Sequence, residues 1–91
     1  MPRIEKQLLI VNKLGLHARA AIKLVQLTAS YQATVMVSNG EKEASADSVM
    51  GLLMLEAAQG QAITVICEGS DANALMSAVE QLVADRFDES E

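Results

Sequence analysis

Aromatic residues are scarce in this sequence, which has no tryptophan, one tyrosine and one phenylalanine among 91 residues. Proteins that bind single-stranded nucleic acids rely on aromatic rings for base stacking. The net charge of -5 would in addition repel a phosphate backbone. We therefore do not expect a nucleic acid as a partner. A hydrophobic fraction of 51% still predicts a folded chain, and its core must be aliphatic.

Cysteine and histidine are each present once, as Cys67 and His17. A single cysteine cannot form an internal disulfide, and one histidine with one cysteine cannot supply the ligands of a structural zinc site. Long hydrophobic runs are also missing, because the first apolar run, residues 8–11, is too short for a signal peptide or a membrane span. We expect a cytoplasmic protein with a reduced thiol, no metal, no cofactor and no membrane partner.

Acidic residues are absent from one long part of the chain. None of the 12 lies between Glu5 and Glu41, although the same stretch contains Lys6, Lys13, Arg19 and Lys23. Short acid-free stretches also arise by chance in small proteins. His17 lies within this stretch, however, so an anionic ligand would meet little repulsion there.

Apolar patterns predict one domain over residues 1–91, with an acidic tail at 88–91 that we expect to be frayed. Alternation with period two predicts strands, and Asn39-Gly40 predicts a tight hairpin. Helical spacing predicts helices, with basic residues outward on the first and Asp71 as the cap of the last. We expect strands at 4–11, 33–38, 41–45 and 61–68, and helices from His17, at 48–58 and after Asp71.

The order of these elements, βαββαβα, provides helices for only one face of a sheet. We therefore expect an α+β fold, an open-faced β-sandwich in which three helices cover one face of a four-stranded antiparallel sheet. Ile63, Val65 and Cys67 share one face of their strand, so Cys67 is predicted to be an ordinary core residue.

His17 is the first candidate for chemistry, because it lies where a helix begins. Backbone N–H groups in a first helical turn have no partner within the helix, and with the helix dipole they favour a bound phosphate. Arg19 adds a fork of donors two residues away, and Gly15 brings no side chain that could cover the ring. These parts suit a phosphohistidine site. The plainer alternative is a solvated histidine beside an exposed arginine.

The helix expected at 48–58 is apolar on every side, and a helix in so small a domain cannot bury its whole circumference. Some of Met50, Leu53 and Met54 should therefore face water and form a docking surface. The alternative is a shorter helix whose apolar run is partly buried. Ser48 is placed to cap this helix, and phosphate added there would oppose docking by charge and desolvation.

Several segments, in order along the chain, resemble the HPr-type phosphocarriers of bacterial phosphotransferase systems. They are Leu14-Gly15-Leu16-His17-Ala18-Arg19, the run from Ser48 to Leu55, Ala58-Gln59-Gly60 and Glu68-Gly69. The resemblance implies that His17 accepts a phosphoryl group on Nδ1 from an enzyme I-type donor and passes it to an enzyme IIA-type acceptor. It also implies that Arg19 assists the transfer, that Ser48 is a site for a serine kinase, and that the partner contacts are Ile22, Met50 and Leu53.

One departure from the family pattern is Ala20, where proline is usual; alanine favours the helix and adds an N–H donor. The His-Ala-Arg-Ala-Ala segment and the Arg86-Phe87-Asp88-Glu89 ending resemble the nitrogen-branch members more than the sugar-branch ones. We thus expect a monomeric transfer intermediate, not a self-contained enzyme. The alternatives are a sugar-branch carrier and a non-catalytic ligand-sensing or dimerisation module.

Overall fold

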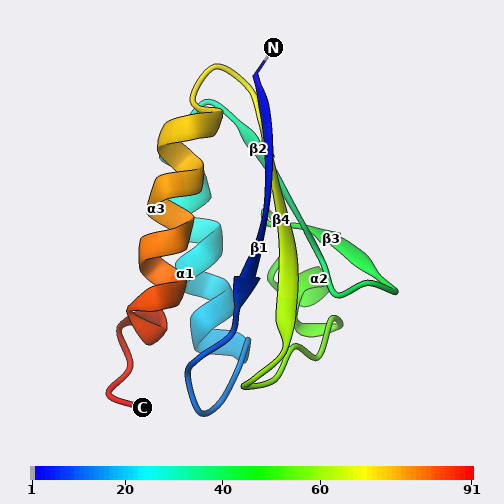
Figure 1. Cartoon of the computed structure of the whole chain (residues 1–91), viewed down its shortest axis with the longest axis vertical. Coiled ribbons are helices and arrows are strands. Elements are labelled where there is room, and N and C mark those ends of the chain that lie inside the picture. Colours follow the sequence, from blue (N-terminus) through cyan, green and yellow to red (C-terminus); the bar gives the residue numbers. More distant parts are fainter. Residues whose placement is uncertain (1) are drawn as a thin grey trace.

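The computed structural model describes residues 2–91, and its elements follow the order expected from the sequence (Figure 1). Three longer helices and four strands alternate along the chain, and a single short turn of helix, η1, follows α3. In chain order the elements are β1 (Arg3–Leu9), α1 (Ala18–Thr28), β2 (Thr34–Ser38), β3 (Glu43–Ser45), α2 (Val49–Leu53), β4 (Ala62–Glu68), α3 (Ala72–Ala84) and η1 (Arg86–Asp88).

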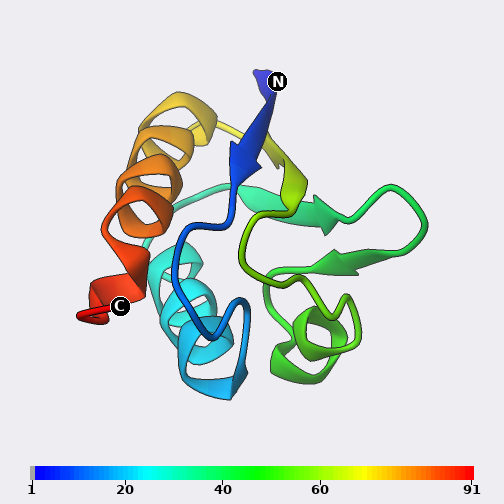
Figure 2. The same ribbon diagram turned by 60° about the horizontal axis from the view of Figure 1, so that its bottom comes forward.

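All strand pairs are antiparallel, and the strand order in the sheet is β1-β4-β2-β3. Figure 2 shows the three helices on the same side of this sheet. The expected open-faced sandwich is therefore confirmed. Edge strand β1 carries Lys6 opposite the buried Val65, and Lys6 pairs with Glu80 of α3 at 2.8 Å. A charged side chain at this position protects the sheet edge from pairing with another chain.

The core lies between the sheet and the helices and is aliphatic except for one ring. Val35 and Val37 of β2 and the alternating apolar residues of β4 point into it, facing buried residues of α1 and α3. Cys67 is fully buried, as expected, and its burial raises the pKa of the thiol, which keeps it neutral. The exception to the aliphatic rule is Phe87, which has no solvent exposure.

Two element boundaries differ from the expectation. The second helix ends at Leu53 and not near residue 58, because the chain tightens into i to i+3 bonds at Leu55 and Glu56. Glu56 then takes a left-handed backbone conformation with φ +51°, which a helix cannot continue. The first strand ends at Leu9, where its pairing with β4 stops at Ala62.

Two turn predictions also need correction. Asn39 and Gly40 do not form a two-residue hairpin: Oδ1 of Asn39 accepts bonds from the N–H groups of Glu41 and Lys42 at 2.9 and 2.8 Å, so the loop spans residues 39–42. Asp71 does precede α3, but its carboxylate makes no capping bond to the helix. It accepts the backbone N–H of Gln32 at 2.8 Å and so ties α3 to the segment before β2.

The acidic tail, residues 88–91, which the sequence predicts to be frayed, contacts the rest of the protein in this structure. Phe87 is buried in the core, and the backbone N–H of Lys13 donates to the carbonyl of Glu91 at 2.6 Å. The ion pair of Asp88 with Lys23, at 3.3 Å, adds a further contact to α1. The buried ring of Phe87 and these polar contacts place the tail beside the start of α1.

Replacing Phe87 by alanine tests this anchoring. We expect Phe87→Ala to lower the free energy of unfolding by about 3–5 kcal/mol, because it removes a fully buried ring. Urea denaturation followed by circular dichroism measures the change. Met50→Ala is the control, since Met50 is 68% exposed and its truncation should shift the stability by less than about 0.5 kcal/mol. Equal stability of Phe87→Ala and wild type would mean that the tail is not packed.

Candidate functional site

His17 lies at the N-cap of α1, with the extended backbone conformation that N-cap residues adopt (φ −82°, ψ −179°). Its Nδ1 accepts the backbone N–H of Arg19 at 3.3 Å, so this ring nitrogen faces the helix N-terminus. The imidazole therefore takes the role that a serine or aspartate side chain usually has at this position. The side chain is 26% exposed, which leaves the ring accessible from solvent.

Donors remain at this end of the helix. The carbonyl of His17 accepts the N–H of Ala21, but the N–H groups of Ala18 and Ala20 have no hydrogen-bond partner within residues 2–91. Proline at position 20 would have no N–H, so Ala20 adds an N–H group to this turn, but Ala20 is fully buried. Ala18 is exposed, so its N–H group can reach an anion beside Nδ1.

Gly15 shapes the loop before His17, though not in the way expected from its missing side chain. Gly15 is buried with φ +68°, and a Cβ on it would lie 2.5 Å from the carbonyl oxygen of Ala57. The N–H of Leu16 donates to that same carbonyl at 2.8 Å. Glycine is thus required because two backbone segments meet here, which fixes the start of α1 against the segment after α2.

A carboxylate from the far end of the sequence meets the other ring nitrogen. Nε2 of His17 is hydrogen-bonded to Oε2 of Glu89, and Oε1 of Glu89 accepts Nδ2 of Asn12 at 3.0 Å. The Asn12 amide is fully buried and also donates to the carbonyl of Gly15 at 2.8 Å. Neither Asn12 nor Glu89 was a candidate from the sequence. The burial of Asn12 is the only signal that could have identified this pair, and the sequence does not show that Asn12 is buried.

Glu89 is charged at neutral pH. Burial alone would raise the pKa of this carboxyl group, but hydrogen bonds from Asn12 and His17, with the nearby charges of His17 and Arg19, hold the pKa below its ordinary value of 4.5. These contacts therefore contribute stability at pH values above 4.5, and the contribution is lost as the pH falls through the lower pKa of the folded state.

The tail also closes one side of a pocket at the histidine. This open pocket has a volume of about 540 Å3, and the residues that line it are Lys13, Leu14, His17, Arg19, Asp88, Glu89, Ser90 and Glu91. The guanidinium group of Arg19 is exposed and forms no ion pair with another described residue. Arg19 is therefore free to take an anion bound beside the ring.

The predicted docking residues lie on two neighbouring helices, because α1 packs against α2. Ile22 of α1 is 44% exposed and Met50 of α2 is exposed, whereas Leu53 is half-buried. Met54, after α2, is exposed as well, which confirms the expectation that this apolar helix cannot bury all of its sides. Ser48 is the N-cap of α2, and its Oγ accepts the N–H of Gly51 at 3.0 Å.

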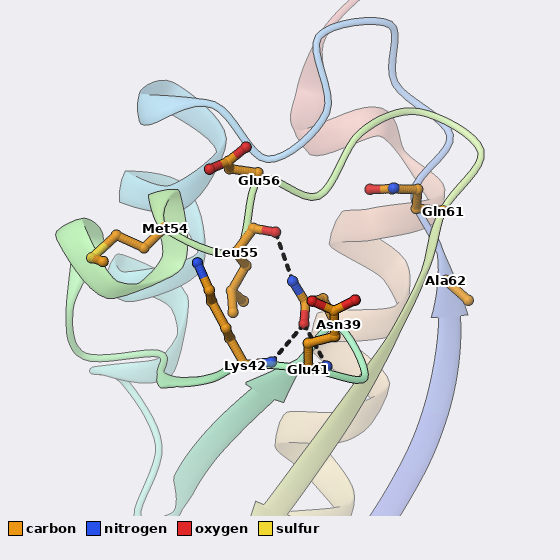
Figure 3. Close-up of a pocket in the computed structure, with 8 residues that line it drawn as sticks. All are labelled: Asn39, Glu41, Lys42, Met54, Leu55, Glu56, Gln61 and Ala62. Atoms are coloured by element: carbon orange, nitrogen blue, oxygen red, sulfur yellow. Dashed lines mark hydrogen bonds between the residues drawn. The ribbon is translucent and has the colours of Figure 1, made fainter.

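A second pocket, of about 500 Å3, shares no lining residue with the pocket at His17 (Figure 3). Its walls come from the loop between β2 and β3 and from the segment that follows α2. Nδ2 of Asn39 donates to the carbonyl of Leu55 at 2.9 Å, which joins the two segments. This bond shows that the pocket lies at a junction between two loops. Its lining includes the charged residues Glu41, Lys42 and Glu56, but no histidine, cysteine, serine or threonine.

The two ring nitrogens of His17 have different surroundings. Nε2 faces a carboxylate, which accepts hydrogen bonds only, and Nδ1 faces N–H donors and Arg19. Such a ring can act as a nucleophile through Nδ1 toward an electrophile that arrives with negatively charged oxygens. Among the described residues, no cluster of histidine, cysteine and acidic side chains could hold a metal ion, and no helix has the length and hydrophobicity to cross a membrane.

Comparison with known proteins identifies the family. Residues 4–85 match the family described as PTS HPr component phosphorylation site. The phosphocarrier protein NPr of Shewanella violacea is 50% identical over 90 residues, 99% of each chain. The phosphocarrier protein HPr of Xylella fastidiosa is 42% identical over 86 residues, 94% of this chain and 97% of that one.

The fold agrees with these sequence relationships. The crystal structure of an HPr from Thermoanaerobacter tengcongensis superposes with a TM-score of 0.86 at 31% identity, and the superposition covers 100% of both chains. The match in sequence and in structure extends over the sheet, the three helices and the loop that carries His17. This chain therefore belongs to the HPr family of phosphocarrier proteins of the bacterial phosphotransferase system.

Proposed function

We propose that His17 carries the phosphoryl group, which it accepts from an enzyme I-type phosphohistidine donor and passes to an enzyme IIA-type acceptor. The observation that supports this most directly is the setting of Nδ1, which faces the N-terminus of α1. The unpartnered N–H group of the exposed Ala18 and the free guanidinium of Arg19 supply donors for phosphoryl oxygens. The protein is then a transfer intermediate and not a self-contained enzyme.

In the proposed transfer, the lone pair of Nδ1 of His17 attacks the phosphorus of the donor's phosphohistidine. A bond from Nδ1 to phosphorus forms, the donor's P–N bond breaks, and its electron pair returns to the donor ring. Arg19 and the helix N-terminus balance the charge of the oxygens during the step. Attack by an acceptor histidine reverses the process and restores His17.

A carrier must release what it binds. If the phosphorylated form were held too strongly, the second transfer would be slow. His17 is partly exposed in an open pocket, and its cationic neighbour Arg19 lies at the surface. Solvent screening limits the stabilisation that such contacts provide, which suits reversible transfer.

The partner-binding surface in this proposal is the set Ile22, Met50 and Leu53, which we call the docking patch. It extends over α1 and α2, the first of which begins at His17. A donor or acceptor seated on this patch would cover apolar side chains that otherwise face water. Ser48, at the N-cap of α2, lies next to the patch in the sequence, so a serine kinase acting there would place charge at its edge.

We also propose that the chain acts in the nitrogen-related branch, as a cytoplasmic monomer. The 50% identity with the NPr of Shewanella violacea supports this assignment, as do the Ala20 position and the Arg86-Phe87-Asp88-Glu89 ending. A sugar-branch carrier would be phosphorylated by a sugar-branch enzyme I. A dimerisation module would instead sediment as a dimer that does not become phosphorylated.

The acceptor residue is tested with phosphoenolpyruvate and a nitrogen-branch enzyme I. Wild type should gain one acid-labile phosphate, seen by intact-mass analysis in alkali, and His17→Ala should gain none, because the chain has no other histidine. Arg19→Ala should lower the transfer rate about 100-fold, since it removes a donor to the phosphoryl oxygens. Phosphorylation of His17→Ala on any residue would contradict the assignment.

Matched controls separate these effects from loss of fold. Arg3→Ala removes an exposed arginine at the start of β1, which lies at the opposite end of the molecule from the start of α1 (Figure 1), and should transfer at the wild-type rate. Circular dichroism should show the same helix content in all variants. If Arg3→Ala were as slow as Arg19→Ala, net charge and not the site would explain the result.

The regulatory proposal is tested at Ser48. Ser48→Asp should raise the half-saturating concentration of the donor about tenfold, or about 1.4 kcal/mol of binding free energy, by placing charge beside the docking patch. Aspartate caps a helix as well as serine does, so α2 should remain intact. Ser48→Asn keeps the cap without the charge and should bind like wild type. Equal binding by Ser48→Asp and Ser48→Asn would contradict the electrostatic argument.

A further inference from the structure

The carboxylate of Glu89 divides its two oxygens between two fixed partners. Oε2 bonds Nε2 of His17, and Oε1 accepts Nδ2 of Asn12 at 3.0 Å. The Glu89 side chain is only 15% exposed, although it belongs to the acidic tail. This contact is distinct from the donors around Nδ1, because it is made on the other nitrogen of the ring.

Asn12 explains why the carboxylate is held in one place. Both acceptors of its amide, the carbonyl of Gly15 and Oε1 of Glu89, can only accept, so the NH2 group must face them. Asn12 is fully buried and cannot exchange these partners for water. One amide therefore connects the tail to the loop that positions His17.

The backbone of the tail is bent to reach this position. Arg86, Phe87 and Asp88 have φ values of +59°, +53° and +63°, a left-handed conformation that is unfavourable for residues other than glycine. Burial of Phe87 and the bond from the Lys13 N–H to the Glu91 carbonyl oppose that cost. The left-handed turn ends immediately before Glu89, which it directs toward the histidine.

The contact determines which ring nitrogen is free. An ionised carboxylate has no hydrogen to donate, so a hydrogen bond to it requires the ring proton on Nε2. The neutral ring then has its lone pair on Nδ1, the nitrogen that faces the Arg19 N–H. A carboxylate that holds a catalytic histidine in one tautomer has the same role in serine hydrolases.

We propose that Glu89 is a positioning residue of the phosphoryl transfer, which keeps the His17 proton on Nε2 and balances the positive charge of the ring when Nδ1 is phosphorylated. This inference rests on the proposed function of His17. When Nδ1 bonds to phosphorus and the donor's P–N bond breaks, no proton leaves Nε2. The ring therefore becomes cationic while it faces the carboxylate.

The first test reads the ring directly in the unphosphorylated protein. Long-range 1H–15N correlation spectra of the single histidine should show the proton on Nε2 in wild type, with a resonance far downfield from its bond to a carboxylate. In Glu89→Ala this resonance should disappear through exchange with water. Asp85→Asn is the control, because Asp85 is exposed, its carboxylate bonds only Gln81, and the net charge changes by the same amount. Identical ring spectra of wild type and Glu89→Ala would overturn the proposal.

The second test separates positioning from docking. Glu89→Gln and Glu89→Ala should lower the maximal rate of phosphoryl transfer about 10- to 100-fold, with the half-saturating donor concentration changed less than about twofold. Glutamine preserves the shape of the side chain, so its loss of rate would reflect the missing charge. A change in half-saturation alone, or an equal loss of rate in Asp85→Asn, would overturn the assignment.

The two tests also distinguish this proposal from the proposed function. If wild type is never phosphorylated while its ring spectrum depends on Glu89, the carrier function fails, and Glu89 no longer has a transfer to assist. If wild type is phosphorylated and the Glu89 variants transfer at the wild-type rate, the carrier function holds and the positioning role fails.

Discussion

The need to bury one face of the sheet determines where the helices and the loops of this molecule lie. Residues of β2 and β4 point alternately inward and outward, and the inward set must be covered because it is wholly apolar. The three helices all pack on that side, so the loops before α1 and after α2 are brought together at one end. There Gly15 lies against the backbone of Ala57, and that contact fixes the position of His17 at the start of α1.

The surroundings of His17 depend on a second and more local constraint, the packing of the tail. Phe87 contributes the only aromatic ring of the core, and its burial brings the residues that follow it to the start of α1. The basic stretch that contains no acid in the sequence thereby receives acidic partners: Asp88 pairs with Lys23, and Glu89 bonds to His17. The local field at the histidine is therefore more balanced than the distribution of charge along the chain suggests.

Much of the fold could be predicted because its elements repeat local patterns. Period-two alternation and helical spacing identified four strands and three helices, and their order left one face of the sheet to be covered. The errors lie where side chains compete for backbone groups. Asn39 uses its amide to widen a turn, and Asp71 bonds Gln32 and not its own helix. Such choices depend on which neighbour is within reach, and that neighbour is set by packing.

The site, like the fold, has features that follow from local sequence and features that depend on packing. The sequence alone determined that a histidine begins a helix with an arginine two residues later, and that an apolar helix has more hydrophobic sides than it can bury. These are local properties of spacing and composition. Only the tertiary structure decided which groups face the two ring nitrogens, because Asn12 and Glu89 lie 77 positions apart and meet through the burial of Phe87. A contact at that separation carries no periodic signal, and it forms only when the core has brought both ends of the chain together.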